Sequence, residues 1–407
     1  MKIKRILYIE SNLDGTVGGS HHSLFLLVKH IDREKYYPIV LFYQDNAMVP
    51  DFNNICEVHI LKNNIVFTIE KIFPKMFKII NRSKYLKIPF LIYQKFHNLV
   101  IFHIPNFIYD FKFIKTHNID LIHANNYPSV TDWLIISKLL RIKIVSHLRG
   151  FYYISNFSKM LVKYYDRIIA TSKWVADQMK EQKIVSENVV LIHNGIDIDT
   201  FQINKISCEN ILKEWNIPEN TPIIGVIGNI RKWKGQHVAI EATKLLVDKY
   251  KNIRCILVGN ISNSNEDTEY FEYLKELVTK YNIKENILFA GFRNDILDII
   301  FNLDILVHTS ILPEPFGRVI LEGMILRKPV IATNQGGPLE IIENAVSGIL
   351  IPPEDPKSLS DNISFLLENK YYSNMMGENA RRRIEEKFNI IKTVKKIEEL
   401  YSSLLRA

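Results

Sequence analysis

The 407-residue sequence predicts an α/β protein with two domains, each built on a parallel sheet. Short apolar runs of strand length alternate with helix-length amphipathic segments along the chain, which is the pattern of parallel strands joined by crossover helices. The chain is too long for one ordinary domain and suits two. Its content of 47% hydrophobic and 24% charged residues is typical of a globular protein.

The N-terminal half contains six clear candidate strands, at residues 5–9, 38–42, 119–124, 143–147, 167–170 and 189–192. A helix is predicted at residues 22–30. The first apolar run is too short for a signal peptide, and no uninterrupted apolar stretch approaches transmembrane length. The cysteines Cys56, Cys208 and Cys255 are odd in number and widely spaced, which favours a reducing cytoplasm over a disulfide framework or a zinc site.

The C-terminal half contains six further candidate strands, at residues 223–227, 254–258, 287–290, 305–308, 330–332 and 348–351. The pattern loosens between residues 200 and 220, where Pro218 appears and Pro222 follows. We therefore expect domains at residues 1–205 and 206–385. The remaining segment, 386–407, contains an amphipathic pattern that predicts a helix at residues 388–405.

The most informative motif places two glutamates, Glu314 and Glu322, eight residues apart. Glu314 lies between two prolines, which hold it on a stiff, non-helical segment. Gly317 permits a sharp change of direction before a helix predicted at residues 318–327. Carboxylates accept paired hydroxyl hydrogen bonds and helix N-termini attract phosphate, so the motif suits a nucleotide sugar. Taken singly, each glutamate could equally be an ordinary solvated residue.

This motif, with Pro-Phe-Gly after its first glutamate, resembles the E-x7-E element of the large retaining glycosyltransferase family 4, and the resemblance covers nearly the whole chain. It implies a GT-B fold, in which two Rossmann-like domains face each other and the C-terminal helix crosses back to pack on the N-terminal domain. It also implies a nucleotide-sugar donor held mainly by the C-terminal domain, with no metal or other cofactor required. In this family, Glu322 would bind the ribose hydroxyls and Glu314 the donor sugar, which amides around Phe316 and Gly317 would help to orient.

A cationic loop, Gly228-Asn-Ile-Arg-Lys-Trp-Lys-Gly235, follows the first strand of the C-terminal half. Its amides and cations could hold a diphosphate, although a loop of solvated cations would look the same. In the family, an arginine and a lysine five residues apart hold the donor phosphates. Lys234 matches that lysine, whereas Asn229 occupies the arginine position. We expect Lys234 to neutralise the diphosphate, and Arg231 is a candidate for the missing charge.

Two N-terminal segments are also candidates. Gly18 and Gly19 lie in a turn that could bring amides near a phosphate or an acceptor, or could be a plain strand-to-helix turn. His147 ends a strand, where open α/β sheets bind ligands. The family resemblance implies that the glycine turn approaches the transferred sugar and that His147 is catalytic with Glu314 and Lys234, while His123 is a weaker candidate.

Another glycine pair, Gly336 and Gly337, precedes a predicted helix start at Pro338. By resemblance these glycines are secondary candidates for lining the donor site. Glu340 is explained by its place in the first turn of that helix, where an acidic residue is favourable.

Residues 61–115 carry ten basic residues and two acidic ones, an excess as large as the net charge of +8 of the whole chain. Basic residues mixed with aromatic ones suit an anionic membrane surface, although helices with an aromatic buried face would look similar. We expect this segment to attach the acceptor side peripherally to the membrane. A nucleic acid is not an expected partner.

The sequence thus predicts a retaining glycosyltransferase that moves a sugar from a nucleotide-sugar donor to a glycan or lipid-linked acceptor during surface-glycan synthesis. Two alternatives stay open: a nucleotide-sugar epimerase of the same fold, and a non-enzymatic nucleotide- or glycan-binding protein, which the departure at Asn229 keeps open. An NAD-dependent dehydrogenase is disfavoured, because the glycine fingerprint is missing after the first strand of both halves.

Overall fold

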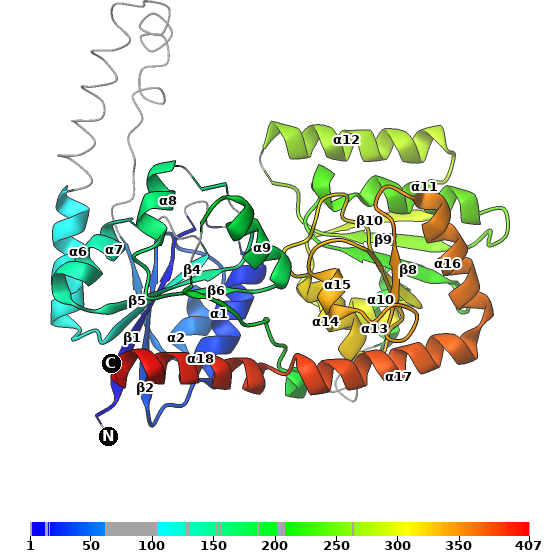
Figure 1. The fold of residues 1–407 in the computed structure, drawn as a ribbon. Coiled ribbons are helices and arrows are strands. Elements are labelled where there is room, and N and C mark those ends of the chain that lie inside the picture. The colour runs from blue at the N-terminus through cyan, green and yellow to red at the C-terminus, as the bar shows by residue number, and fades with distance from the viewer. Residues whose placement is uncertain are drawn as a thin grey trace, which may run out of the picture. The chain divides into compact units, whose positions relative to one another are not determined.

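The computed structural model describes residues 2–12, 15, 17–61, 104–126, 131–151, 153–154, 156–184, 187–201, 208–262 and 264–406. The chain divides into two compact units. Unit 1 comprises Met1–Ala170, Gln178–Leu191 and Lys395–Ala407, and unit 2 comprises Thr171–Asp177 and Ile192–Val394. Each unit has its own sheet with helices on both sides (Figure 1).

Unit 1 contains a seven-stranded sheet in the order β3-β2-β1-β4-β5-β6-β7, with every neighbouring pair parallel. The strands are β1 (Lys4–Glu10), β2 (Tyr36–Phe42), β3 (Glu57–Ile60), β4 (Leu121–Asn126), β5 (Lys143–Leu148), β6 (Arg167–Ala170) and β7 (Val189–Leu191). Its helices include α1 (Gly19–His30), α2 (Val49–Asn53), α6 (Ile104–Thr116), α7 (Thr131–Leu140), α8 (Asn156–Val162) and α9 (Lys173–Glu181), whose first residues belong to unit 2. From β1 the chain adds β2 and β3 on one side of the sheet and then β4 to β7 on the other, so the direction in which strands are added reverses between β1 and β4.

Unit 2 contains a six-stranded parallel sheet in the order β10-β9-β8-β11-β12-β13, which reverses between β8 and β11. The strands are β8 (Ile223–Ile227), β9 (Arg254–Val258), β10 (Ile287–Gly291), β11 (Ile305–His308), β12 (Val330–Thr333) and β13 (Ile349–Ile351). The helices include α10 (Cys208–Glu214), α11 (Gln236–Leu246), α12 (Asn265–Lys280), α13 (Ile296–Asn302), α14 (Arg318–Ile325), α15 (Pro338–Ile341), α16 (Pro356–Glu368) and α17 (Lys370–Lys387).

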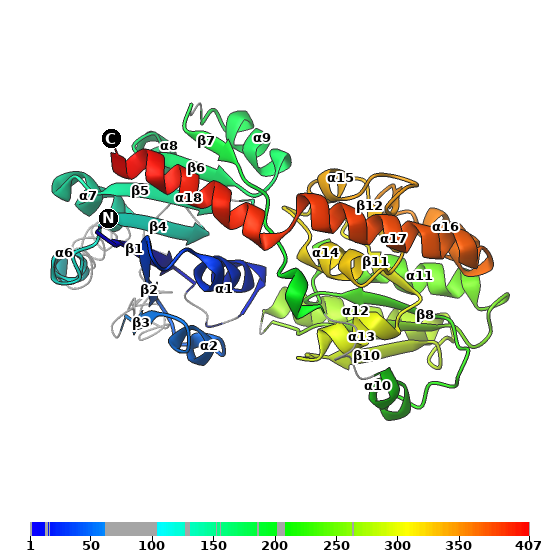
Figure 2. The same ribbon diagram turned by 90° about the horizontal axis from the view of Figure 1, so that it is seen from below.

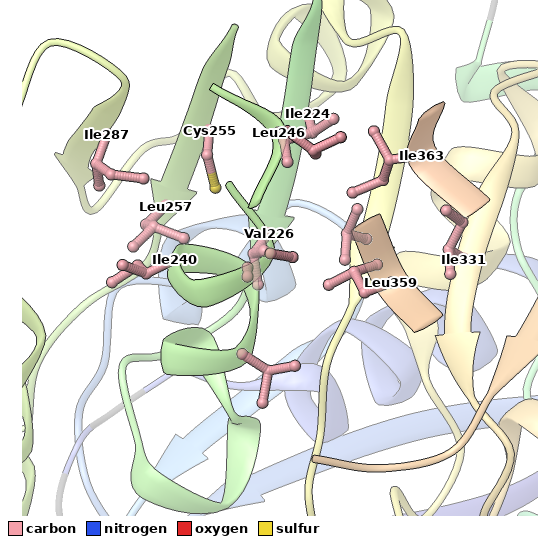
Figure 3. Close-up of a cluster of buried hydrophobic side chains, with 14 of the residues drawn as sticks. Ile224, Val226, Ile240, Leu246, Cys255, Leu257, Ile287, Ile331, Leu359 and Ile363 are labelled. Carbon is pink, nitrogen blue, oxygen red and sulfur yellow. The ribbon is translucent and has the colours of Figure 1, made fainter. Parts of the chain in front are cut away.

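The core of unit 2 follows from the two-residue period of its strands. Ile224 and Val226 of β8 face one hydrophobic cluster, together with residues of α11 and α16 (Figure 3). Ile223 faces the opposite cluster with residues of α13, α14 and α17. Because both faces are covered, the strands consist mostly of apolar residues, as parallel strands usually do, and polar residues such as Arg254 and His308 stand at strand ends.

The predicted α/β class with parallel sheets is confirmed, and three local expectations need correction. Strand β3 was missed because it lies at the sheet edge with every residue only half-buried, which leaves no clear apolar alternation. Helix α1 begins at Gly19, three residues before the predicted start. Helix α14 ends at Ile325, two residues short of the prediction.

Helix α18 (Ile390–Arg406) supplies the part of unit 1 that comes after unit 2 in the sequence (Figure 2). Tyr401 is fully buried there, and its ring contacts that of Tyr36 on β2 at 5.7 Å between centroids. Glu398 accepts the backbone N–H of Asp32 at 2.7 Å. In the described part of the chain, every helix is too short or too polar to cross a membrane.

Candidate functional site

The candidate site of unit 2 lies where the winding of its sheet reverses. In doubly wound sheets, ligands bind outside the carboxyl ends of the strands at that point. The segment after β8 contains Lys234, in a short 3₁₀ helix (Lys232–Lys234), and β11 ends at His308. The loop after β11 contains Glu314. The structure therefore brings Lys234 and Glu314, two residues predicted to act together, to the same sheet edge.

The Glu314 carboxylate is the centre of this site. Its Oε2 atom pairs with Nζ of Lys234, lies 3.2 Å from Nε2 of His308, and accepts a longer hydrogen bond of 3.5 Å from Oγ of Ser310. The side chain is only 12% exposed. Burial alone would raise the pKa of Glu314, but the charge of Lys234 and the hydrogen bond from His308 outweigh it and lower that pKa to about 2. Glu314 is therefore ionised at neutral pH and can accept hydrogen bonds but cannot donate a proton.

Lys234 is held in place by its neighbours. Its ammonium group lies 4.3 Å from the centroid of the Trp233 ring, a cation–π contact. Its backbone carbonyl accepts the Thr309 hydroxyl at 3.1 Å. Gly235 follows with φ of +66°, and a Cβ there would lie 2.2 Å from the carbonyl oxygen of Thr309. Only glycine permits this close approach between the two loops.

The glycine pair 336–337 holds the Glu314 loop from its other side. Glu314 and Gly336 form a parallel β-bridge, and the Gly337 N–H donates to the Glu314 carbonyl at 2.7 Å. A Cβ on Gly336 would lie 2.3 Å from that carbonyl oxygen, and one on Gly337 would lie 2.2 Å from the Phe316 carbonyl oxygen. These glycines thus position the loop, which is a packing role in addition to the lining role predicted for them.

Helix α14 begins directly after Gly317, whose φ of +104° turns the chain from the loop into the helix. Phe316 is buried beneath this turn at 3% exposure. Glu322 lies one turn into α14, and its Oε1 accepts Nη2 of Arg318 at 3.2 Å. The two predicted glutamates therefore have different cationic partners. Glu314 is paired with Lys234, and Glu322 is paired with Arg318.

The structure separates Arg231 from this arrangement. Its side chain is 41% exposed and pairs with Asp267 of α12 at 3.6 Å. Asn229, at the family's arginine position, is exposed, and its carbonyl accepts Nε2 of Gln236 at 3.0 Å. Lys234 is thus the cation that contacts Glu314, and Arg231 belongs to a different ion pair.

The candidate residues of unit 1 also gather near a reversal of winding, between β1 and β4. His147 of β5 is fully buried, and its Nδ1 lies 3.2 Å from Nε2 of His123 on β4. His123 Nδ1 lies 2.6 Å from the Tyr401 hydroxyl, which donates in turn to the Tyr8 hydroxyl at 3.4 Å. Burial and the charge of Arg149 lower the pKa of both histidines well below its ordinary value, so both rings are neutral.

These contacts form one buried chain of polar groups. It runs from His147 through His123 and Tyr401 to Tyr8. At its end, Nε2 of His147 has no hydrogen-bond partner among the described residues.

A polar cluster that the sequence analysis did not identify lies at the same sheet edge. The buried Glu10 carboxylate accepts hydrogen bonds from Nδ2 of Asn125 at 2.6 Å and from Nδ2 of Asn126 at 2.9 Å. Arg149 Nε donates a hydrogen bond to the side-chain oxygen of Asn125 at 2.9 Å. The available signal was a polar residue directly after each of two apolar strands. Gly18 and Gly19 form the start of α1, and a Cβ on Gly18 would meet no atom within 4 Å.

Two further residues of unit 2 were missed or incompletely explained. His308 is the last residue of a predicted strand, a position that could have indicated its contact with Glu314. Glu340 lies in the first turn of α15 as expected, but its carboxylate also binds Nε2 of His193 at 2.8 Å and the backbone N–H of Lys173 at 2.9 Å.

Two features from the sequence, the basic aromatic segment and the cysteines, remain outside these contacts. Most of the basic aromatic segment, residues 62–103, lies outside the described residues. Cys56 and Cys255 are free thiols, and the Cys208 side chain is not among those described.

Two family models together match most of the chain. The model described as glycosyl transferases group 1 matches residues 207–383, and the model described as glycosyltransferase family 4 matches residues 17–200. The fold and the matched models define a glycosyltransferase of the GT-B type. The chain belongs to this family, which confirms the resemblance inferred from the E-x7-E motif.

Relatives of assigned function share about a quarter of their aligned residues with the chain. The capsular polysaccharide biosynthesis glycosyltransferase CapM of Staphylococcus aureus is 26% identical over 244 residues, which are 59% of this chain and 62% of CapM. The UDP-Gal:alpha-D-GlcNAc-diphosphoundecaprenol alpha-1,3-galactosyltransferase of Escherichia coli is 25% identical over 72% of this chain and 78% of its own length. The chain spans about three fifths of the length of CapM and similar curated relatives.

Solved structures with the same fold cover the chain almost completely. A glycosyltransferase from Rickettsia africae has a TM-score of 0.81 and 23% identity, with 100% of this chain and 99% of that chain covered. Anabaena HepE, crystallised with UDP and glucose, has a TM-score of 0.77 and 23% identity, with 98% and 99% covered. At this level of identity, both show the fold.

Proposed function

We propose that this protein is a retaining glycosyltransferase that transfers a sugar from a nucleoside-diphosphate sugar to a hydroxyl group of a glycan or lipid-linked acceptor. One observation carries the proposal: a buried, ionised Glu314 is paired with Lys234 at the sheet edge where doubly wound folds bind nucleotides. Membership of the glycosyltransferase family supports it and favours transfer over the epimerase alternative.

Each residue has a defined part in this proposal. A bound diphosphate would share the Lys234 ammonium with Glu314, and that cation would stabilise the negative charge that develops as the diphosphate leaves. Glu314 would accept hydrogen bonds from sugar hydroxyls, which carboxylates do well. Glu322 would accept the ribose hydroxyls, with Arg318 fixing its second oxygen. Catalysis would then rest on positioning and charge stabilisation.

Retention would follow if the acceptor attacks from the face that the diphosphate leaves. The bond between the anomeric carbon and the phosphate oxygen breaks, the acceptor oxygen bonds to the same carbon, and the hydroxyl proton passes to the leaving diphosphate. The chain's own groups can serve this step without a metal, because the donor-side carboxylates already have cationic partners in Lys234 and Arg318.

On the acceptor side, we propose that Glu10 and its asparagine partners bind acceptor hydroxyls, and that Nε2 of His147, which has no partner among the described residues, forms a hydrogen bond with a further acceptor hydroxyl. The relatives suggest the class of substrate, since HepE was crystallised with UDP and glucose and the E. coli relative is named for a UDP-galactose donor. We therefore propose a uridine diphosphate sugar as the donor and surface-glycan synthesis as the pathway.

The basic segment 61–115 motivates the proposed location, which is the cytoplasm at the inner surface of the membrane. Its excess of lysine and arginine would draw it to anionic lipids, with each basic residue near the surface contributing about 1 kcal/mol. A lipid-linked acceptor would lie at that same surface.

A thermal-shift panel of nucleoside diphosphates and their sugars tests the donor assignment. A ligand at a hundred times its dissociation constant adds about 2.7 kcal/mol of apparent stability, which is easily detected. We expect stabilisation by uridine diphosphate and one or more of its sugars. The transferred product should keep the anomeric configuration of the donor, as read from its NMR coupling constants. Absence of stabilisation by every nucleotide would contradict the proposal.

A further inference from the structure

A second cluster of ionisable side chains lies at the edge of the unit 1 sheet, away from the residues assigned above. Glu57 and His59 are two residues apart on edge strand β3, so their side chains point to the same face of the sheet. His117 directly follows α6. Glu57 Oε1 lies 2.8 Å from Nε2 of His59 and 3.4 Å from Nε2 of His117. These three atoms all lie within 4.8 Å of one another.

Hydrogen bonds to neighbouring groups restrain two of these three side chains, His117 and Glu57. His117 Nδ1 lies 2.9 Å from the Phe113 carbonyl oxygen, which can only accept, so Nδ1 carries a proton and Nε2 is the ring nitrogen left to bind an ion. The other carboxylate oxygen, Glu57 Oε2, accepts the Tyr37 hydroxyl at 3.0 Å and Arg5 Nη2 at 3.3 Å. Hydrogen bonds of this kind orient the ligands of metal ions in proteins.

The rings are also packed against one another. Phe113 stacks on His117 with centroids 4.0 Å apart and meets His59 edge-on at 4.9 Å. The side chains of Glu57, His59 and His117 keep exposures of 27%, 31% and 20%. The cluster is therefore restrained by packing yet can be reached by a solvated ion.

We propose that Glu57, His59 and His117 bind one divalent transition-metal ion, with Zn²⁺ preferred and water in the fourth position. Two imidazoles and one carboxylate are a common protein ligand set for zinc. Tetrahedral bonds of about 2.0–2.2 Å place ligand atoms about 3.3 Å apart, close to the 3.4 Å between Glu57 and His117. The shorter contact between Glu57 and His59 would widen as the ion replaces the proton between them.

The ion would connect two elements that are distant in the sequence. Edge strand β3 and the end of α6 flank a long intervening stretch of chain. Joining its ends reduces the conformational freedom of the unfolded chain and so stabilises the folded unit. The proposed role is structural, and it is independent of the transfer reaction proposed for the donor site.

Titration of the metal-stripped full chain with Co²⁺, and with Zn²⁺ by calorimetry, tests this site directly. We expect one equivalent of metal to bind, with the visible absorption of tetrahedral Co²⁺, and Zn²⁺ to raise the melting temperature. Glu57→Gln and His117→Ala should each lose this affinity by at least about tenfold. Tyr37→Phe, which keeps all three ligands, should weaken binding by about tenfold. His30→Asn, on α1 of the same unit, is the matched control and should bind as the unchanged chain does.

Two results would overturn the proposal. One is the absence of Co²⁺ absorption and of Zn²⁺ heat in the unchanged chain at about neutral pH, which would show that protons alone bridge these residues. The other is equal affinity in the unchanged chain, Glu57→Gln and Tyr37→Phe, which would place the metal elsewhere. Because the unchanged chain and Tyr37→Phe keep every ligand, the test does not depend on whether a ligand variant folds.

Discussion

Glu314 is the residue with the most heavily constrained surroundings in the donor site. Its side chain contacts a lysine and a histidine, while its backbone carbonyl receives the Gly337 N–H. Removing the partner of a buried, paired carboxylate strongly destabilises the folded protein. This accounts for the density of glycines and prolines around it, which hold the backbone where these contacts can form.

Lys234→Ala and Glu322→Ala should each weaken nucleoside-diphosphate binding. Losing one charge-assisted hydrogen bond should cost about 1.5–3 kcal/mol, roughly a 10- to 150-fold loss of affinity measured by calorimetry. Lys232→Ala is the matched control, since Lys232 lies in the same loop with an exposed side chain. Unchanged affinity in both variants would refute the site assignment.

Glu314→Gln should reduce turnover far more than it reduces affinity for the bare nucleoside diphosphate, because its proposed partner is the sugar. A collapse of nucleotide affinity in this variant would show that the proposed division of roles between the two glutamates is wrong.

The same variant should change the acid sensitivity of folding. Because the folded-state pKa of Glu314 is about 2 against an ordinary 4.5, its contribution to stability is complete above about pH 5 and is lost as the pH falls towards 2. Between pH 7 and pH 3 this loss amounts to about 2 kcal/mol. Urea denaturation should therefore show a smaller fall in unfolding free energy over that range for Glu314→Gln. An equal fall in both proteins would contradict the assigned shift.

Among the elements, the parallel strands were the easiest to predict. The buried strands β8 and β11 consist almost entirely of apolar residues, with His308 at the end of β11, so their positions follow from composition. The edge strand β3 was missed because none of its side chains is fully buried. The loop that contains the E-x7-E motif could also be recognised, because proline fixes the backbone and glycine permits sharp turns, and both residues are visible in the sequence.

The contacts among these elements could not be predicted from the sequence. The place of His308 at the end of a strand indicates the sheet edge but does not identify Glu314 as its partner, and nothing near Arg231 indicates its partner Asp267. Both contacts arise from how separate crossover units pack on one sheet. The contact of Tyr401 with His123 is a long-range case, because it joins residues 278 positions apart in the sequence.

Tyr401→Phe should destabilise the protein by roughly 1–3 kcal/mol, because it leaves the buried Nδ1 atom of His123 without its partner. Urea denaturation measures this loss, and Tyr371→Phe is the control, since Tyr371 is 84% exposed. Nitrogen NMR shifts of His123 should also move, because the Tyr401 hydroxyl is the partner of its Nδ1 atom. A stable variant with unaltered histidine shifts would show that the hydroxyl positions nothing.

At the scale of the whole molecule, the transfer reaction should survive chelation. We expect activity to persist in EDTA, because Lys234 supplies positive charge at the donor site, even where chelation lowers the melting temperature through the proposed zinc site. Complete loss of activity that is restored by Mg²⁺ at an unchanged melting temperature would contradict metal-free transfer.

Binding to membranes is a second property of the whole molecule. In co-sedimentation, we expect the protein to bind anionic liposomes and to be released as salt shortens the screening length below about 10 Å. Substitution of Lys75, Lys78, Arg82 and Lys84 by glutamine should abolish binding, whereas the charge-matched change at Lys244, Lys251, Lys275 and Lys280 in unit 2 should not. Equal recovery in the supernatant with anionic and neutral liposomes at low salt would refute membrane attachment.

The packing of α18 on unit 1 has a consequence for the order in which the protein can mature during synthesis. The residues 395–407 that complete unit 1 are translated only after all of unit 2. While the ribosome is still making unit 2, Tyr8 and His123 lack the Tyr401 side chain that buries against them. Unit 2 can therefore reach its native state first, although domains usually fold in the order of their synthesis. A nascent chain halted before residue 395 should present a protease-resistant unit 2 behind a protease-sensitive unit 1.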